Sequence, residues 1–307
     1  MCPIAGIFSK DGNDVSSQMN SMLTQMYLTG ESEAWLIANN TVQRWKGIIP
    51  RGVEAKQNGQ VLGQVSFNVS VAKDKPPERP CFDKQNGLLL LYEGVLYNYS
   101  ELRSRLKIDY QIEGETAAEI VAKLAGERYQ GNLEGALKEI IKDLDGVYTL
   151  AVGNETEFAL LRDTVGRRPA YIAENSEYMA FASKKKALWG IGLRNVKPLR
   201  AGEMAVFKRG NVIITKAAPI TNIDLCQEID DSDITVSRYQ KALSKAMDKR
   251  LAGLERVGVL LSGGVDSCLL ARIIYQLAAK SRLEVRAYTA GLAGSPDVAY
   301  AQRFAKR

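Results

Sequence analysis

The sequence predicts an α/β protein with two domains: a layered α/β sandwich over residues 1–218 and the beginning of an open parallel sheet over residues 234–307. Three observations support this prediction. Many short strand-like runs, interrupted by two groups of helical periodicity, are typical of sheets covered by helices. The pattern changes to strand–helix–strand after residue 234, as in open parallel sheets. Between them, an acidic stretch of low hydrophobicity indicates a linker at residues 219–233.

Hydrophobic periodicity gives the elements of the first domain. Strands are predicted at 1–8, 61–69, 88–92, 147–152, 158–161, 179–182 and 211–216, within a strand-like region that covers 35–97. Helices are predicted at 15–29, 99–106, 115–129 and 133–144. Three prolines between residues 73 and 80 predict a loop.

The second domain is predicted from a shorter series of elements. A helix at 236–251 is followed by a strand at 257–261, a helix at 268–277, a strand at 283–289 and a final amphipathic segment. Two strands do not form a stable sheet of this kind alone. We therefore expect this domain to be incomplete at residue 307.

Composition excludes several classes of function. The 41 Lys and Arg against 35 Asp and Glu give a net charge of +6, spread without a basic stripe, so no nucleic-acid partner is expected. The chain has 307 residues and four cysteines, and no two of these form a CxxC pair. No apolar run reaches the length of a membrane span. A cytoplasmic protein with no membrane partner is expected. The absence of histidine excludes His-based triads and most catalytic zinc sites.

The strongest chemical motif is SGGVDS at 262–267, between a predicted strand and a predicted helix. The two glycines let backbone N–H groups approach a phosphate, and the helix N-terminus adds free donors. Asp266 is a candidate ligand for Mg²⁺ that bridges phosphates. The predicted ATP-binding residues are Leu261, Ser262, Gly263, Gly264, Asp266, Ser267 and Thr289. The alternative is an ordinary glycine turn that caps a helix.

Cys2 is a candidate nucleophile. Once Met1 is removed, its thiol lies beside its own α-amine, whose pKa of about 8 suits it to accept the thiol proton. This arrangement needs no histidine. The alternative is a small buried residue that begins a strand.

Further motifs occur in an order that resembles the class II, N-terminal-nucleophile glutamine amidotransferases. The matching segments are MCPIAGIF at 1–8, Arg51-Gly52, EGVLYNY at 93–99, Gly114-Glu115-Thr116, Leu144-Asp145-Gly146, RDTVGRRP at 162–169 and Phe181-Ala182-Ser183. This resemblance implies an αββα sandwich with Cys2 as nucleophile and an oxyanion site at Glu93 and Gly94. It also implies that Arg51 binds the glutamine α-carboxylate and Glu115 its α-amine.

The SGGVDS motif resembles the pyrophosphate loop of ATP pyrophosphatases, and Gly294-Ser295-Pro296-Asp297 resembles a segment of asparagine synthetases. Together the two halves resemble the glutamine-hydrolysing asparagine synthetase family. The resemblance implies that ATP and Mg²⁺ activate an acceptor carboxylate, most simply that of aspartate, as an acyl-adenylate. Ammonia from glutamine then forms the amide. A homodimer, or a subunit that supplies the rest of the synthetase domain, is a possible partner.

Several residues depart from the family pattern, beginning with Pro3 in place of Gly or Ser and with Val53-Glu54 where the family pairs Pro with Asp or Glu. Gln64 and Ser66 stand where the family has His and Arg, Glu93 replaces an oxyanion-site Asn, and Val95 replaces a Glu. An ionised Glu93 would repel an oxyanion, and loss of one such donor costs roughly 10²–10³ in rate. The alternative function is therefore a degenerate member with an inactive glutaminase that serves as structural or regulatory partner of a synthetase. A third possibility, the β-lactam synthetase branch, is disfavoured by Cys2.

Two charged motifs have simpler interpretations. Arg162 and Asp163 are expected to form an ion pair at a turn that positions strands, and Lys184-Lys185-Lys186 is expected to be a solvated surface.

Overall fold

The computed structural model describes residues 2–26, 32–38, 41–46, 60–67, 79–106, 116–154, 156–208, 210–219, 232–292 and 294–306. The chain divides into two compact units, Met1–Ile223 and Asp224–Arg307. Most of the predicted linker at 219–233, and most of the predicted loop at 73–80, lies outside the described residues.

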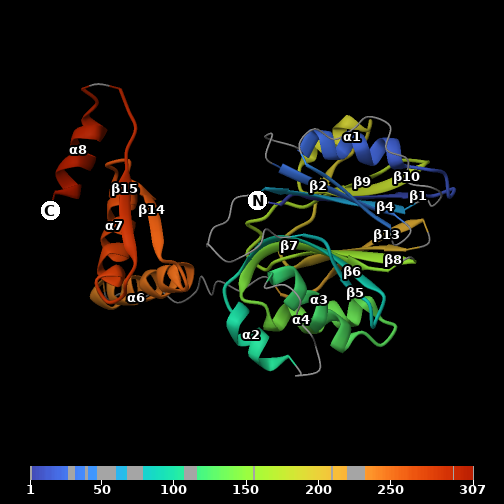
Figure 1. Cartoon of the computed structure of the whole chain (residues 1–307), viewed down its shortest axis with the longest axis horizontal. Coiled ribbons are helices and arrows are strands. Elements are labelled where there is room, and N and C mark those ends of the chain that lie inside the picture. The colour runs from blue at the N-terminus through green and yellow to red at the C-terminus, as the bar shows by residue number, and fades with distance from the viewer. Residues whose placement is uncertain are drawn as a thin grey trace. The chain divides into compact units, whose positions relative to one another are not determined.

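The first unit contains two sheets stacked face to face (Figure 1). The first sheet has the order β11-β9-β10-β1-β4-β2-β3, and the second β13-β12-β8-β7-β6-β5. The first sheet consists of β1 (Ile4–Ser9), β2 (Ser32–Ala38), β3 (Thr41–Lys46), β4 (Gln60–Phe67), β9 (Tyr171–Glu174), β10 (Tyr178–Ala182) and β11 (Lys197–Pro198). The second consists of β5 (Cys81–Asp83), β6 (Leu88–Leu96), β7 (Gly146–Gly153), β8 (Glu157–Arg162), β12 (Glu203–Lys208) and β13 (Asn211–Lys216).

Helices cover the outer face of each sheet (Figure 1). The first sheet carries α1 (Ser16–Met26) and α5 (Lys185–Gly190), and the second carries α2 (Tyr99–Arg105), α3 (Ala117–Arg128) and α4 (Leu133–Asp143). Each helix layer forms its own hydrophobic core with the sheet beneath it. The predicted αββα sandwich is confirmed.

A third core lies between the two sheets. Its members alternate along each strand with residues that face the helices, as the period of two in a strand requires. Aromatic rings fill its centre, where Phe8 of β1 stacks on Phe207 of β12 with ring centroids 5.0 Å apart. The two sheets are therefore held together by side chains that point inward from both.

The predicted elements agree with most of those observed, but some short ones are missing from the prediction. The sequence gives no separate strand for β9 or β12 and no helix for α5. The first two of these are only four and six residues long, which leaves little periodicity to detect. The lysine run lies at the start of α5, which the sequence did not predict. Lys185 and Lys186 are exposed, as expected.

The second unit is a strand–helix–strand arrangement flanked by two further helices. Its elements are α6 (Ser232–Leu251), β14 (Arg256–Leu260), α7 (Val265–Ala278), β15 (Glu284–Tyr288) and α8 (Pro296–Ala305). The strands β14 and β15 pair in parallel, as predicted. Many of its large apolar side chains are exposed, including Leu260 at 83% and Leu292 at 85%. No helix in the described part of the chain is both long and apolar enough to cross a membrane.

We expect the fragment 233–307 to be unstable when it is isolated. Its two strands leave apolar side chains in water, and a chain this short buries too little surface to offset the entropy of folding. Urea unfolding followed by circular dichroism should show no cooperative transition. A cooperative transition of the monomeric fragment would show that two strands suffice.

Candidate active site

The layer between the sheets is apolar at one end and polar at the other. On β6, Leu89 and Leu91 belong to the inter-sheet core, and the same alternation carries Glu93 into this layer. On β4, Leu62 belongs to that core and is followed on the same face by Gln64. The polar end, as we call it, consists of Cys2, Gln64, Ser66, Glu93, Thr149 and Ser183.

Cys2 is placed at the polar end by the pairing of the first strand. The carbonyl of Pro3 accepts a hydrogen bond from the N–H of Val65 (2.9 Å), so the pairing of β1 with β4 continues to this residue. Cys2 therefore lies on the same face as Ile4, which belongs to the inter-sheet core. It is 9% exposed and its sulfur forms no disulfide.

Ser183 holds the beginning of β1 in place. Its hydroxyl accepts a hydrogen bond from the N–H of Ile4 (3.0 Å), and its own N–H donates to the Ile4 carbonyl (2.9 Å). Ser183 directly follows β10 and is 2% exposed. Ile4 lies two residues after the candidate nucleophile. Both its N–H and its carbonyl are thus hydrogen-bonded to Ser183.

Glu93 points into the protein. It is 3% exposed, and its Oε2 atom is buried with no hydrogen-bond partner among the described residues. Burial raises the pKa of the Glu93 carboxyl. The Ser183 hydroxyl and the cations of Arg168, the N-terminal amine and Lys184 offset part of this rise. Burial has the largest effect on this pKa and disfavours the charged form. The Glu93 carboxyl therefore keeps its proton to a higher pH than a carboxyl in water.

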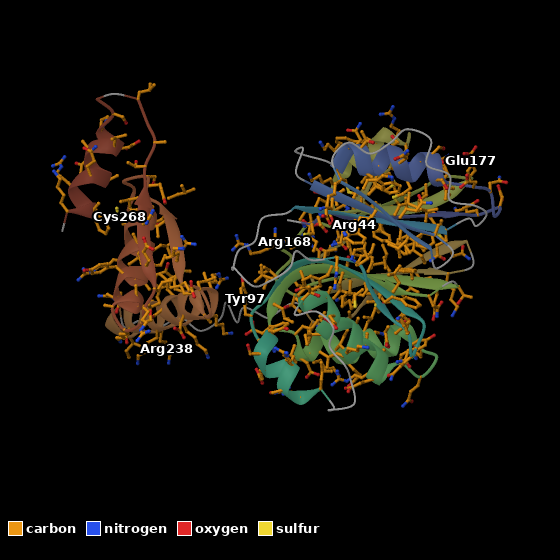
Figure 2. The ribbon with its side chains drawn as sticks, viewed as in Figure 1. Arg44, Tyr97, Arg168, Glu177, Arg238 and Cys268 are labelled. Carbon is orange, nitrogen blue, oxygen red and sulfur yellow. The ribbon has the colours of Figure 1, made fainter. Side chains whose placement is uncertain are left out.

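The loop after β8 brings Arg168 toward Glu93. Asp163 accepts hydrogen bonds from the N–H groups of Tyr148 (3.1 Å) and Gly166 (2.7 Å), which fixes the loop to β7. Thr149, the partner of Glu93 in the β6–β7 pairing, donates to the Arg168 carbonyl (3.3 Å). Figure 2 shows Arg168 at the edge of the sandwich between the two sheets.

Arg162 has a structural role, but it does not form the expected ion pair with Asp163 and binds backbone carbonyls instead. Its guanidinium donates to the carbonyls of Arg168 (2.6 Å), Leu199 (2.6 Å) and Gly166. Because Arg162 and Asp163 each bind backbone groups of the same loop, they stiffen the segment that carries Arg168.

Gly94 is required by close packing between strands. A Cβ atom at this position would meet the Val147 carbonyl and lie 2.6 Å from the Cβ of Tyr148 on β7. Val95, the next residue, is 45% exposed at the end of β6. A side chain larger than hydrogen at position 94 would separate β6 from β7 beside Glu93.

Gln64 and Ser66 take the places of the family's His and Arg within the polar end. The Gln64 amide nitrogen lies 3.5 Å from both the Ser66 hydroxyl and the Tyr92 carbonyl of the other sheet. Gln64 therefore connects the two sheets. The predicted glutamine-binding residues Arg51 and Glu115 lie outside the described residues.

The predicted phosphate loop joins β14 to α7 in the second unit. Gly263 has a φ of +84°, and a Cβ atom there would meet the Asp297 carbonyl of α8. The hydroxyls of Ser262 and Ser267 are 2.9 Å apart, and Ser267 donates to the Gly264 carbonyl (3.0 Å). The loop is thus a tight glycine turn closed by its own serines at the start of a helix.

The remaining predicted ATP-binding residues surround this turn. Leu261 donates its N–H to the carbonyl of Tyr288, the last residue of β15 (2.7 Å), so Thr289 follows directly at the same sheet edge. Asp266 lies in the first turn of α7. No group of three or more candidate metal-ligating side chains occurs in the described ranges. A single carboxylate fits Mg²⁺ held mainly by phosphates and water.

Comparison with known proteins identifies both halves of the chain. Residues 67–190 match the family model of a glutamine amidotransferase domain, and residues 238–307 match that of asparagine synthase. The solved structure of glutamine phosphoribosylpyrophosphate amidotransferase from B. subtilis is similar in fold, with a TM-score of 0.58 and 18% identity. That match covers 92% of this chain and 65% of the other. The first unit therefore has the fold of N-terminal-nucleophile glutamine amidotransferases.

Curated relatives indicate the family more closely. A putative glutamine-hydrolysing asparagine synthetase of Methanocaldococcus jannaschii is 26% identical, over 100% of this chain and 56% of that protein. Asparagine synthetase B of Escherichia coli is 23% identical, over 99% of this chain and 52% of that protein. The chain thus combines a match to a glutamine amidotransferase domain with a match to asparagine synthase. It spans about half the length of the curated relatives it matches.

Two charged residues near Glu93 were missed by sequence reasoning. Arg168 and Lys184 both act on the Glu93 carboxyl. Lys184 was interpreted as part of a solvated run, but it is half-buried and its ammonium donates to the Met26 carbonyl (3.0 Å). The sequence signal that could have placed Lys184 near the site is its position directly after Ser183, just past the end of β10.

We expect Glu93→Gln to change how stability depends on pH. A carboxyl whose pKa is raised in the folded state binds its proton more tightly there than in the unfolded chain. As the pH rises above the ordinary carboxyl pKa of 4.5, the unfolded chain loses this proton first, so the free energy of unfolding falls. The Gln variant should therefore gain stability relative to the wild type with increasing pH. Thermal unfolding across pH measures this.

Glu101→Gln is the matched control for this measurement. Glu101 is exposed and pairs with Arg105 on the surface (2.5 Å), so its replacement should leave the pH profile close to that of the wild type. Equal profiles for Glu93→Gln and the wild type would contradict the raised pKa.

Proposed function

We propose that this chain belongs to an ATP-dependent, glutamine-hydrolysing amidotransferase that forms an amide from an acceptor carboxylate, with aspartate as acceptor and asparagine as product. The observation that carries this proposal is the placement of Cys2 at the polar end, beside the reciprocal hydrogen bonds of Ser183 and Ile4. The two family matches and the named relatives support it.

The proposed glutaminase step uses Cys2 after removal of Met1. The α-amine of Cys2 takes the thiol proton, and the sulfur attacks the side-chain carbonyl of glutamine, so that the C–S bond forms and an electron pair moves to oxygen. When the oxyanion collapses, the C–N bond breaks and the leaving nitrogen takes the proton from the ammonium. Water then cleaves the thioester to glutamate and restores the thiol.

In this proposal Gly94 lies beside the oxyanion, and Arg51 and Glu115 bind the α-carboxylate and the α-amine of glutamine, as the family resemblance implies. The cation of Arg51 and the anion of Glu115 would suit the two opposite charges of a zwitterionic amino acid. The stiff loop held by Arg162 and Asp163 keeps one wall of the polar end in place.

The proposed synthetase step uses the second unit. Backbone N–H groups of the turn at 262–264 and the N-terminus of α7 would bind the phosphates of ATP, with Asp266 holding Mg²⁺ against them. When bound, the magnesium ion neutralises phosphate charge during adenylylation. Gly263 fits such contact because its surroundings leave no room for a side chain.

The buried carboxyl of Glu93 favours a second candidate function. An ionised carboxylate near an oxyanion opposes catalysis, and Val95 at the end of the same strand removes a further carboxylate of the family pattern. The alternative is a degenerate glutaminase domain that serves as a structural or regulatory partner of a synthetase. Glutamate release separates the two functions.

We expect the chain to release glutamate from glutamine slowly, and Cys2→Ala to lower the release to background because the nucleophile is lost. Coupled detection of glutamate measures the rate, with mass spectrometry confirming that Met1 is absent. Cys81→Ala is the matched control, since this half-buried thiol lies on β5 and should not affect the rate. Equal release by the wild type and Cys2→Ala would favour the alternative function.

For the second unit, Gly263→Ala should weaken binding of MgATP by at least about tenfold. Its φ of +84° costs other residues roughly 1–2 kcal/mol, and the added methyl would meet the Asp297 carbonyl. Gly264→Ala is the control, because Gly264 has a φ of −73° and only the Ser262 hydroxyl oxygen, 3.5 Å away, near its Cβ position. Titration calorimetry measures both affinities.

The same site predicts a catalytic effect in a form that carries the complete synthetase. Asp266→Ala should abolish exchange between ATP and pyrophosphate by removing the magnesium ligand. Unchanged exchange, or equal ATP affinities for the two alanine variants, would contradict the phosphate-loop assignment.

A further inference from the structure

Glu93 differs from the other buried carboxylates of the first unit in how its oxygens are bonded. Asp163 accepts hydrogen bonds from the backbone, and Glu157 pairs with Lys208 (2.7 Å). By contrast, the Oε2 atom of Glu93 is buried without a hydrogen-bond partner among the described residues. An ionised oxygen in this position would lack the donors that normally stabilise buried charge.

The position of Glu93 relative to the candidate nucleophile is set by a short chain of contacts. The Ser183 hydroxyl is near enough to Glu93 to lower the pKa of its carboxyl, and the same hydroxyl accepts the N–H of Ile4 (3.0 Å) and donates to the Ile4 carbonyl (3.3 Å). Cys2 precedes Ile4 by two residues on the same face of the strand. Glu93, Ser183 and Cys2 therefore share the polar end of the layer between the sheets.

We propose that Glu93 acts as a neutral carboxylic acid whose O–H donates a hydrogen bond to the oxyanion formed at Cys2, in the place of an amide donor. The inference rests on the proposed glutaminase. It assigns a catalytic role to the residue that otherwise argues most strongly against that activity. The proton stays on Glu93 throughout, since the hydrogen bond stabilises the oxyanion without proton transfer.

The surroundings of Glu93 are compatible with this role. Its strand neighbour across the β6–β7 pairing is Thr149, and the charged groups that act on its carboxyl are Arg168 from the loop after β8, the N-terminal amine and Lys184 after β10. Burial favours the neutral acid, and the three cations oppose it less strongly. Each cation would also favour a developing negative charge nearby.

The experiment compares glutamate release across pH for the wild type, Glu93→Gln, Glu93→Asn and Glu93→Ala. The wild-type rate should fall at alkaline pH as the Glu93 proton is lost. Glu93→Gln and Glu93→Asn carry amide donors and should lack this decline, so they should exceed the wild type at alkaline pH. Glu93→Ala has no donor and should be slower by roughly 10²–10³ wherever the wild-type acid is protonated.

Glu157→Gln is the matched control, because it removes a buried glutamate that faces away from the inter-sheet layer. Its alkaline decline should match that of the wild type. Infrared difference spectra between the wild type and Glu93→Gln give a readout independent of activity, since a neutral carboxylic acid and a carboxylate absorb differently. The acid signal should disappear over the same pH range as the rate.

Two results would overturn this inference: an alkaline decline that persists in Glu93→Gln, or an ionised Glu93 in the infrared spectrum at a pH where the wild type is fully active. Failure of the proposed function has a different signature. In that case Cys2→Ala would release as much glutamate as the wild type, whatever the state of Glu93.

Discussion

The pair of hydrogen bonds between Ser183 and Ile4 joins positions 179 residues apart and fixes the start of the first strand. The rest of the site depends on this contact. Because the strand begins here, Cys2 falls on the face that points between the sheets, and the pairing with β4 puts Gln64 opposite Ile4 on that face. The same serine is near enough to Glu93 of the opposite sheet to lower the pKa of its carboxyl. One residue thus connects the nucleophile, both sheets and the buried carboxyl.

A sandwich with an apolar layer at one end and polar residues at the other separates stability from chemistry. Phe8, Phe158 and Phe207 hold the sheets together where no substrate needs to enter. At the polar end the same alternation places groups that bind or react, and burial there strengthens electrostatic effects. Glu93 is the clearest case, since its position costs stability when ionised and gains a function only when neutral.

The sequence predicted the fold class and the two-part organisation, because alternation and the SGGVDS turn are local patterns. It placed the strand at 211–216 with the bounds observed, since a glycine turn precedes it. It did not place Arg168 or Lys184 near Glu93, because their positions depend on a loop fixed by Asp163 and on the pairing of β10 with β1. Such contacts join distant segments and leave no periodicity. The inward direction of the Glu93 side chain followed only from the structure.

The central claim is that Cys2 at the polar end is the nucleophile of a glutamine site. Covalent labelling tests it most directly, with 6-diazo-5-oxo-L-norleucine, a glutamine analogue that alkylates a nucleophilic thiol, and peptide mass spectrometry to locate the label. We expect modification of Cys2 that excess glutamine prevents, while Cys81, Cys226 and Cys268 remain unmodified. Labelling that glutamine does not slow, or that occurs equally at the other three cysteines, would contradict it.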